Sequence, residues 1–376
     1  MVKMEKATTE KPMSARLRGV RRSLRALTIW HPYGRAYSNP RWWRQLLRAA
    51  FVQTQVPQEW IGHETISLIF TCDLELDPPW GGGSWDQRGF RGIEEGLPRL
   101  LDLLDAHKIQ GTFFTEGLLA SLAPEAVVEV ARRGHEVGCH SLAHESHGGR
   151  YRVDETIPPP RAPEGKAAKE AVIRKAKDML EELVGVPIRS FRAPFLHIDS
   201  AGSEAVADAG FFIDSSLQNH LFGYLSAPAH LDPGNPLSRT RVDGPPHRLI
   251  EIPVSVDPRP RLRSRHPYPS VDQGVQTRSV LQRIIAASAL AGAAPTLVLL
   301  VHPWEFVEGF QNPFGQKHGT ARAERFEHLL ECLRQQGHIR SISIGAFASE
   351  WEQNRCPWHA DLVQGKSSPP VEGVVN

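Results

Sequence analysis

Short apolar runs alternate with helical patterns through most of this chain, and this alternation limits the fold more than any other feature of the sequence. Strands are predicted over residues 65–72, 111–115, 135–139, 188–192, 211–215, 248–254, 296–302 and 341–344. Amphipathic helices are predicted over 93–107, 123–134, 168–185, 280–292 and 322–337. Strands that alternate with helices build a parallel sheet. Seven or eight such units favour one α/β barrel over two separate domains.

Charge and composition divide the 376 residues into three predicted regions, which are a basic N-terminal extension at 1–62, a catalytic barrel at 63–352 and a partly disordered C-terminal tail at 353–376. The first 50 residues hold twelve Lys or Arg and two Glu, a net charge of +10, whereas the whole chain carries +2. Long loops rich in Pro, Gly, His and Arg are predicted over the barrel mouth, at 145–167, 218–247 and 257–275.

Residues 41–52 of the extension predict a basic amphipathic helix that contains Trp42, Trp43, Leu46 and Phe51. Packing of this helix against the barrel is favoured, because Arg and Trp are also common at protein interfaces. Peripheral contact with the inner membrane is the alternative. No nucleic-acid partner is expected, because the segment lacks a recognised reading motif and the net charge of the chain is close to zero.

The sequence also predicts the cellular compartment of the protein. No apolar run approaches the roughly 18 residues that a membrane-spanning helix needs. The N-terminus has no apolar segment of the kind found in secretory signals. Cys72, Cys139, Cys332 and Cys356 form no CxxC motif or close pair, which is typical of a reducing compartment. We therefore expect a cytoplasmic protein.

Four histidines cluster in the segment GHEVGCHSLAHESH, directly around the predicted strand 135–139. His140 and His144 are four residues apart, so a helical turn after the strand would direct both imidazoles to one side, where they can share a metal. A histidine pair at this spacing is more often part of a solvated helix face. Its position after a strand favours the metal, because the loops that follow the strands of a parallel barrel carry the active site.

Three carboxylates, Asp73, Glu75 and Asp77, end the first strong strand in the segment TCDLELD. They alternate with Leu74 and Leu76, so on an extended backbone all three lie on one face. Carboxylates in this arrangement repel one another unless they are exposed to solvent or are neutralised by a cation or an arginine. The sequence alone leaves both the solvated strand end and the cation site open.

Three further predicted strands also end in polar residues, which are Arg192, Asp214 and His302. Each has an ordinary structural explanation, such as a surface arginine, a capping aspartate or a core histidine. The carboxyl ends of parallel strands meet at one end of a barrel, however, and five strands here deliver residues capable of chemistry. This coincidence favours an active site.

Five motifs occur in a fixed order between residues 63 and 352, which are TCDLELD, HSLAH after GHEVGC, FRAP, the aspartate of FIDSS, and LLVHP. In this order they resemble the polysaccharide deacetylases of carbohydrate esterase family 4. The resemblance implies a distorted (β/α)7-type barrel and metal-dependent hydrolysis of the amide of an N-acylated sugar or glycan. It implies catalytic roles for Asp73 as base, Arg192 as the partner of the base, His302 as general acid and Asp214 as the carboxylate that orients His302. It also implies His140 and His144 as metal ligands.

The first motif departs from the common family pattern, in which two aspartates are adjacent and the second binds the metal. Leu74 occupies that second position here. The sequence is instead similar to the branch with a D-x-E or D-x-D first motif, which implies Glu75 as the carboxylate ligand and Asp77 as the fallback. Two imidazoles and one carboxylate suit Zn²⁺ and would accept Co, Ni or Fe.

The acyl group and the substrate stay open between N-deacetylation and N-deformylation of a polysaccharide, an oligosaccharide or a lipid-linked amino sugar. Residues 91–114 look like the deformylases that act on undecaprenyl-phosphate-linked amino sugars, which agrees with contact between the basic extension and the inner membrane face. One alternative is a hydrolase of small cyclic or linear amides, which also occur in this branch. The other is a barrel that binds a glycan without turning it over.

Overall fold

The computed structural model describes residues 65–80, 83–149, 161–217, 229–231, 249–256, 277–290, 294–310 and 318–353. The predicted basic extension with its helix at 41–52, residues 354–376 of the predicted tail and most of the three predicted long loops lie outside this part of the chain. Among the described residues, no helix has the length and apolar character required to span a membrane.

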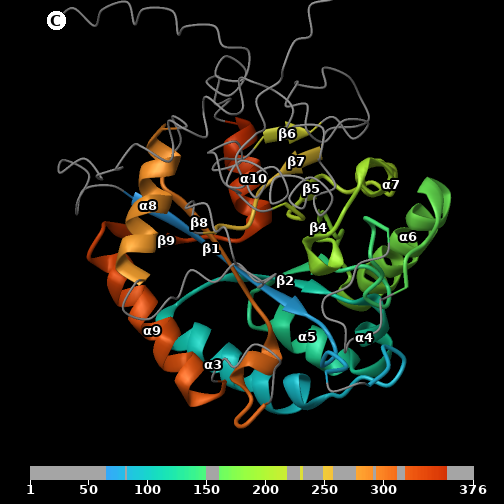
Figure 1. Cartoon of the computed structure of the whole chain (residues 1–376), viewed down its shortest axis with the longest axis horizontal. Coiled ribbons are helices and arrows are strands. Elements are labelled where there is room, and N and C mark those ends of the chain that lie inside the picture. Colours follow the sequence, from blue (N-terminus) through green and yellow to red (C-terminus); the bar gives the residue numbers. More distant parts are fainter. Residues whose placement is uncertain are drawn as a thin grey trace, which may run out of the picture. The chain divides into compact units, whose positions relative to one another are not determined.

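Nine strands in the described residues form one sheet (Figure 1). They are β1 (Thr65–Leu74), β2 (Gly111–Thr115), β3 (Glu136–Cys139), β4 (Ser190–Phe191), β5 (Ile213–Asp214), β6 (Ala229–Leu231), β7 (Leu249–Glu251), β8 (Thr296–Val301) and β9 (His338–Ser341). The order along the sheet is β6-β7-β5-β4-β3-β2-β1-β8, and β9 pairs with the first residues of β1. Among the strand pairs of the described residues, β6 and β7 are antiparallel and the others are parallel.

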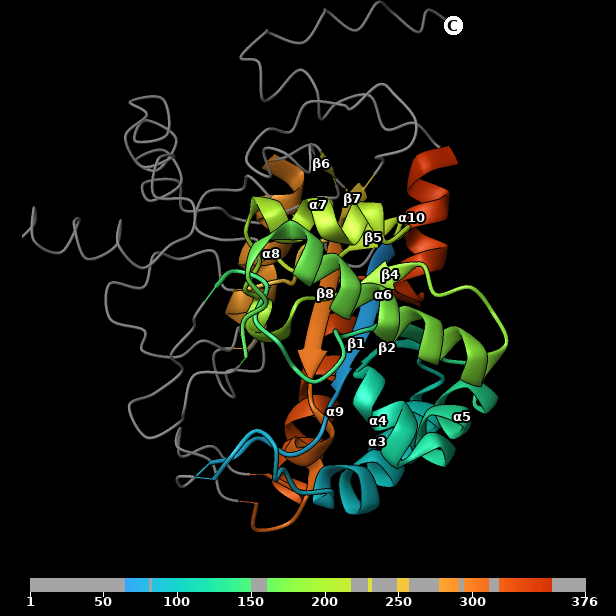
Figure 2. The ribbon, with the colours of Figure 1, turned by 90° about the vertical axis from the view of Figure 1, so that its right-hand side faces the viewer.

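Helices surround the sheet and connect its strands (Figures 1 and 2). They are α3 (Leu97–His107), α4 (Gly117–Leu122), α5 (Pro124–Arg132), α6 (Gly165–Val184), α7 (Ser200–Asp208), α8 (Thr277–Leu290), α9 (Thr320–Arg334) and α10 (Ile344–Gln353). A π-helical turn, η3 (Gly92–Gly96), precedes α3, and two 3₁₀ turns, η4 (Pro194–Leu196) and η6 (Pro303–Phe306), follow β4 and β8. Strands alternating with helices around a curled sheet confirm the predicted distorted β/α barrel.

The sheet closes through an irregular contact between the segment after β7 and strand β8. The backbone N–H of Ser255 donates to the carbonyl of Val298 over 3.0 Å, and the N–H of Val298 donates to Oγ of Ser255 over 3.0 Å. The interior is filled by apolar side chains from several strands, including Ile69, Phe114, Ile213 and Ile250. Strand β1 lies between β2 and β8 and is buried after its first residue, which explains its nearly continuous apolar sequence.

The last predicted strand, 341–344, is displaced in the structure. Strand β9 ends at Ser341, and α10 begins at Ile344. Exposure alternates along β9, whose sequence HIRS is largely polar, so it has little of the apolar pattern that marks a strand. Helices α4, α7 and α10 were not predicted, and α4, with six residues, is too short to establish a helical period in the sequence.

Parallel pairing brings the carboxyl ends of the strands to one end of the barrel. In register, Asp73 of β1 lies beside Phe114 of β2, and Cys139 of β3 lies beside Phe191 of β4. The residues that follow these strand ends therefore gather in one place, and they are Glu75, Glu116, His140, Arg192, Ser215 and His302.

Candidate active site

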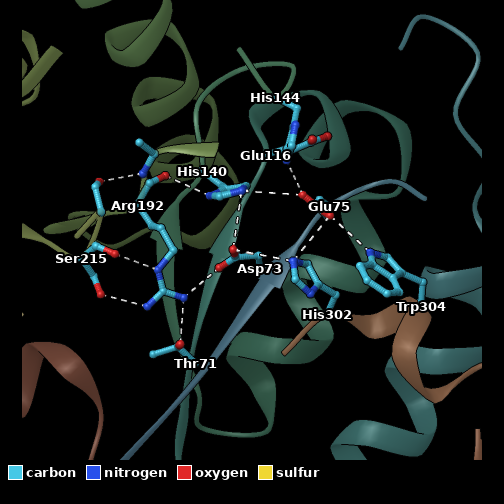
Figure 3. A network of polar contacts seen from close by, with 12 residues as sticks. Thr71, Asp73, Glu75, Glu116, His140, His144, Arg192, Ser215, His302 and Trp304 are labelled. Atoms are coloured by element: carbon cyan, nitrogen blue, oxygen red, sulfur yellow. Dashed lines mark hydrogen bonds and ion pairs between the residues drawn. The ribbon is translucent and has the colours of Figure 1, made fainter. Parts of the chain in front are cut away.

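Six buried side chains converge at this end of the barrel, and Figure 3 shows them as one polar network. They are Asp73, Glu75, His140, His144, Arg192 and His302, and none is more than 5% exposed. All six were predicted as site residues from the ends of their strands. The seventh predicted residue, Asp214, contacts Ser216 and Glu251 and has no contact with these histidines among the described residues.

Glu75, His140 and His144 form a group with the geometry of a metal site, because one ligand atom from each lies within 4.8 Å of the others. Oε2 of Glu75 is 3.7 Å from Nε2 of His140 and 2.5 Å from Nε2 of His144. Nε2 of His140 is buried and has no hydrogen-bond partner among the described residues. Buried polar atoms are normally satisfied, so this donor set fits a divalent cation.

The orientation of His140 supports this interpretation. Its Nδ1 lies 2.9 Å from the carbonyl oxygen of Arg192, which can only accept a hydrogen bond. Nδ1 therefore carries a hydrogen, and Nε2 is the ring nitrogen that faces Glu75. A hydrogen bond from the second ring nitrogen to a carbonyl or carboxylate is the usual way in which proteins fix a metal-binding histidine.

Glu75 is held as an anion. Burial alone would raise the pKa of Glu75, but the neighbouring imidazoles of His144, His140 and His302 lower it well below its usual value. Its other oxygen, Oε1, accepts a hydrogen bond of 3.2 Å from Nε1 of Trp304. The carboxylate is thus ionised and oriented, as a metal ligand must be.

The two histidines meet across a tight turn rather than along a helix, so the helical turn assumed in the sequence analysis is wrong. Ser141 and His144 have left-handed backbone angles, with φ of 67° and 64°. The carboxylate of Glu145 holds this turn by accepting from Oγ of Ser141 over 2.7 Å and from the N–H of Ala143 over 2.9 Å. The rings of His140 and His144 lie 5.3 Å apart.

Asp77, the fallback ligand, is occupied elsewhere. Its two oxygens accept hydrogen bonds from the backbone N–H of Arg91, over 2.9 Å, and of Gly92, over 2.8 Å, where the chain enters η3. A Cβ on Gly92 would lie only 2.6 Å from Oδ1 of Asp77, so this close approach requires glycine. Asp77 therefore anchors the start of this helical segment, and Glu75 is the carboxylate that faces the histidines.

Arg192 binds Asp73 as predicted. Its Nη1 donates to Oδ1 of Asp73 and to Oγ1 of Thr71, each over 2.8 Å. Its Nε donates to the carbonyl of Ser215 over 3.0 Å, and its Nη2 donates to Oγ of Ser215 over 2.9 Å. The guanidinium is fixed on both sides. It leaves Oδ2 of Asp73 facing His140, whose Nε2 lies 3.8 Å away.

His302 lies on the opposite side of the carboxylates from His140. Its Nε2 is 3.9 Å from Oδ2 of Asp73 and 3.8 Å from Oε1 of Glu75, and its ring stacks on Trp304 with centroids 4.5 Å apart. Burial alone would lower the pKa of His302, but a hydrogen bond to Glu305 and the charges of Glu75, Glu305 and Asp73 raise it above its usual value. The surroundings thus favour the protonated ring.

The prediction that Asp214 orients His302 is wrong. Nδ1 of His302 lies 2.9 Å from Oε1 of Glu305, a residue that was not predicted. Asp214 instead accepts a hydrogen bond from Oγ of Ser216 and lies beside the buried carboxyl of Glu251. Glu305 is only three residues from His302, in the 3₁₀ turn that follows β8, and so reaches its ring locally.

Aromatic residues and one buried ion pair complete the surroundings of His144, and none of them was predicted. The ring of Trp85 is stacked on His144 with centroids 5.1 Å apart, and Phe195 meets the same ring edge-on at 4.5 Å. Arg88 donates from Nε to the carbonyl of Trp85 over 3.2 Å. Arg88 also forms a bidentate ion pair with Glu116, in which Nη1 lies 2.5 Å from Oε1 and Nη2 lies 2.9 Å from Oε2. Both side chains are buried.

Residues 85–212 match a family model described as polysaccharide deacetylase. The chain is 28% identical over 164 residues to the peptidoglycan deacetylase of Helicobacter pylori, a match that covers 42% of this chain and 51% of the relative. It is 30% identical over 114 residues to the peptidoglycan-N-acetylglucosamine deacetylase of Bacillus cereus, which covers 30% of this chain and 46% of the relative. The chain thus spans about half the length of each of these two relatives.

The fold has counterparts among solved structures. The crystal structure of a putative polysaccharide deacetylase from Mycobacterium smegmatis superposes with a TM-score of 0.52 and 23% sequence identity. The match covers 80% of this chain and 94% of that one. At this identity the likeness concerns the fold.

Proposed function

We propose that this chain, which matches the polysaccharide deacetylase model over residues 85–212, is a metal-dependent hydrolase that removes the acyl group from an N-acylated amino sugar of a glycan. The observation that carries this proposal is the group formed by Glu75, His140 and His144, whose buried ligand atoms lie directly beside Asp73. A cation site next to an ionisable carboxylate is what amide hydrolysis by water needs.

Glu75, His140 and His144 would hold the divalent cation, and Zn²⁺ suits this ligand set, with Co, Ni or Fe as alternatives. When bound, such a cation polarises the amide carbonyl and lowers the pKa of a water molecule. Assignment to the D-x-E branch of the family stays a prediction from Glu75.

Asp73 accepts the proton of the attacking water in this mechanism. Its Oδ1 is held by Arg192, so Oδ2, which lies between Nε2 of His140 and Nε2 of His302, is the oxygen available to the water. The buried guanidinium of Arg192 balances the charge of Asp73 and fixes its orientation.

His302 supplies the second proton. As the new bond between the water oxygen and the acyl carbon forms and the C–N bond breaks, Nε2 of protonated His302 gives its proton to the departing amine nitrogen. An amine is a poor leaving group unless it is protonated, so this step matters for an amide. The raised pKa of His302 supports the role of a general acid.

The substrate class is proposed from the two relatives, which are both peptidoglycan deacetylases, and from the polysaccharide deacetylase family. We expect an N-acetylated or N-formylated amino sugar within a glycan or on a lipid carrier. A cytoplasmic location, with the basic extension in contact with the inner membrane, stays part of this proposal.

Metal content and product release test the proposal together. Wild-type protein and His140→Ala, purified without a histidine tag and exposed to Zn²⁺ or Co²⁺, are compared by elemental mass spectrometry. We expect about one equivalent in the wild type and a loss of it in the variant. Release of acetate or formate from N-acetyl- and N-formylglucosamine oligomers then identifies the acyl group. A protein that binds no metal and releases neither product would favour the non-catalytic glycan-binding barrel. Hydrolysis of small amides alone would favour the other alternative.

A further inference from the structure

Glu305 holds His302 through both its backbone and its ring. Oε1 of Glu305 accepts from the backbone N–H of His302 over 3.0 Å and lies 2.9 Å from Nδ1 of the same residue. An ionised carboxylate has no hydrogen to donate and can only accept hydrogen bonds. Nδ1 of His302 is therefore the atom that carries the hydrogen. Nε2 is then the nitrogen that faces Asp73 and Glu75.

The second oxygen of Glu305 is held by Arg322 of helix α9. Nε of Arg322 lies 2.5 Å from Oε2 of Glu305, and both side chains are largely buried. Arg322 also lies over the ring of Phe306. Since each oxygen of Glu305 has its own donors, the carboxylate has little freedom to rotate, and α9 is connected through it to the ring of His302.

We propose that Glu305 and Arg322 are positioning residues that keep a hydrogen on Nδ1 of His302 and so present Nε2, which carries the second hydrogen when the ring is protonated, to the reacting atoms. The catalytic consequence rests on the function proposed above, whereas the orientation of the ring does not. The carboxylate that orients His302 is therefore Glu305, from the same loop, and not Asp214 as the sequence predicted. Arg322, from a distant helix, supports this carboxylate.

A purely structural role for Glu305 is the competing explanation, because the same carboxylate also caps η6. Glu308 separates the two explanations. It lies on the same loop and connects it to the start of α9, since it accepts from the N–H of Thr320 over 2.6 Å, yet it has no contact with His302 among the described residues. If the connection between loop and helix is all that matters, loss of Glu308 and loss of Glu305 should have similar effects.

The variant Glu305→Gln tests the proposal most directly. Glutamine has the shape of glutamate, but it lacks the charge that favours the protonated ring, and its amide NH₂ can donate to Nδ1, which would leave a neutral ring with its hydrogen on Nε2. Replacing the carboxylate beside a catalytic histidine by its amide is known to leave the fold intact while producing the wrong tautomer. Arg322→Lys, which keeps the positive charge but not the fixed geometry of Nε, provides a second variant that leaves Glu305 in place.

The first measurement is nitrogen-15 NMR of histidine-labelled, Zn²⁺-loaded protein, in which His302→Gln identifies the signals of His302 among the 17 histidines. We expect protonated Nδ1 in the wild type and in Glu308→Gln, and loss of that pattern in Glu305→Gln. An unchanged pattern in Glu305→Gln, or an equal change in Glu308→Gln, would overturn the proposal. This result does not depend on turnover, so it stands even if the proposed activity is absent.

The second measurement is turnover of an N-acetylglucosamine oligomer and of 4-nitrophenyl acetate, whose phenol leaves without help from an acid. For the amide we expect kcat of Glu305→Gln and of Arg322→Lys to fall at least about tenfold, with KM changed less than about threefold. The ester should be affected much less, and Glu308→Gln should resemble the wild type on both. Equal losses on both substrates would contradict the proposal. A wild type that hydrolyses neither would contradict the proposed function alone.

Discussion

Nη1 of Arg192 lies 2.8 Å from Oδ1 of Asp73, and this ion pair is almost completely shielded from solvent. Because Nη1 also donates to Thr71, and Nε and Nη2 each donate to Ser215, the guanidinium has one fixed position. The position of Asp73 is therefore set by β1 and by the residues that follow β4 and β5. Its free oxygen faces the two histidines on either side.

Asp73→Asn should abolish most of the activity while leaving the metal site intact. The amide cannot take a proton from water, so we expect kcat to fall by roughly 10² or more, the range for loss of a general base. Zn²⁺ affinity, measured by competition with a chelator, should change less than about threefold, since Asp73 is not among the three proposed ligands. Turnover close to that of the wild type would remove Asp73 as the base.

Glu75→Gln should weaken metal binding, whereas Asp77→Asn should lower the stability of the fold. Glu75 faces both histidines, so its loss should weaken Zn²⁺ binding by at least about tenfold. Asp77 accepts two backbone N–H groups at the start of η3, so its loss should leave Zn²⁺ affinity nearly unchanged and lower the free energy of unfolding by about 1 kcal/mol, as for a lost helix cap. The reverse order of the two affinities would make Asp77 the ligand.

The parts of the site that could be predicted from the sequence are those carried by strand ends. Asp73, His140, Arg192 and His302 each follow a buried apolar run, and parallel pairing brings such ends together whatever the details of the loops. The alternation of carboxylates with leucines likewise indicated that Asp73 and Glu75 lie on the same face of the strand. The structure confirms this, because an oxygen of each lies 3.9 or 3.8 Å from Nε2 of His302.

The parts that could not be predicted depend on contacts between distant segments. The partner of Glu116 is Arg88, 28 residues away on a loop without periodicity, and Trp85 reaches His144 only because that loop folds back. Glu305 could have been predicted from local spacing alone. In a 3₁₀ turn a residue three positions after His302 lies on the same side of the turn as His302. The resemblance to a family directed attention to Asp214 instead.

The buried ion pair between Arg88 and Glu116 should matter for stability. Glu116→Gln leaves a buried guanidinium without its counter-charge, and we expect the free energy of unfolding in urea to fall by about 3 kcal/mol. The double variant Arg88→Met, Glu116→Leu should recover most of this loss, because no buried charge is then left unpaired.

The exposed pair between Arg161 and Asp86 is the matched control, and Asp86→Asn should have little effect. A double variant that is as unstable as Glu116→Gln would contradict this expectation. It would show that the ion pair stabilises the fold by more than the cost of burying its two charges. It would also point to a direct role of Arg88 in holding the loop that carries Trp85.

Asp214 should make the fold less stable as pH rises. Burial raises the pKa of Asp214 to about 7, in spite of its hydrogen bond from Ser216, and burial together with the charge of Asp214 raises that of Glu251. In the unfolded chain an aspartate titrates at about 3.9. Between roughly pH 4 and pH 7 the folded protein thus binds protons that the unfolded chain has released. This contribution to stability is complete below pH 4 and is lost as pH rises through 7.

Asp214→Asn removes the titrating group but keeps an oxygen that can accept from Ser216. We therefore expect the variant to gain stability relative to the wild type as pH increases from 5 to 8, measured as the difference in unfolding free energy in urea at each pH. Taking the difference cancels the titration of the histidines, which both proteins share. Parallel curves over this range would mean that Asp214 is already ionised in the folded protein, and that Arg192, whose charge favours the carboxylate, offsets its burial.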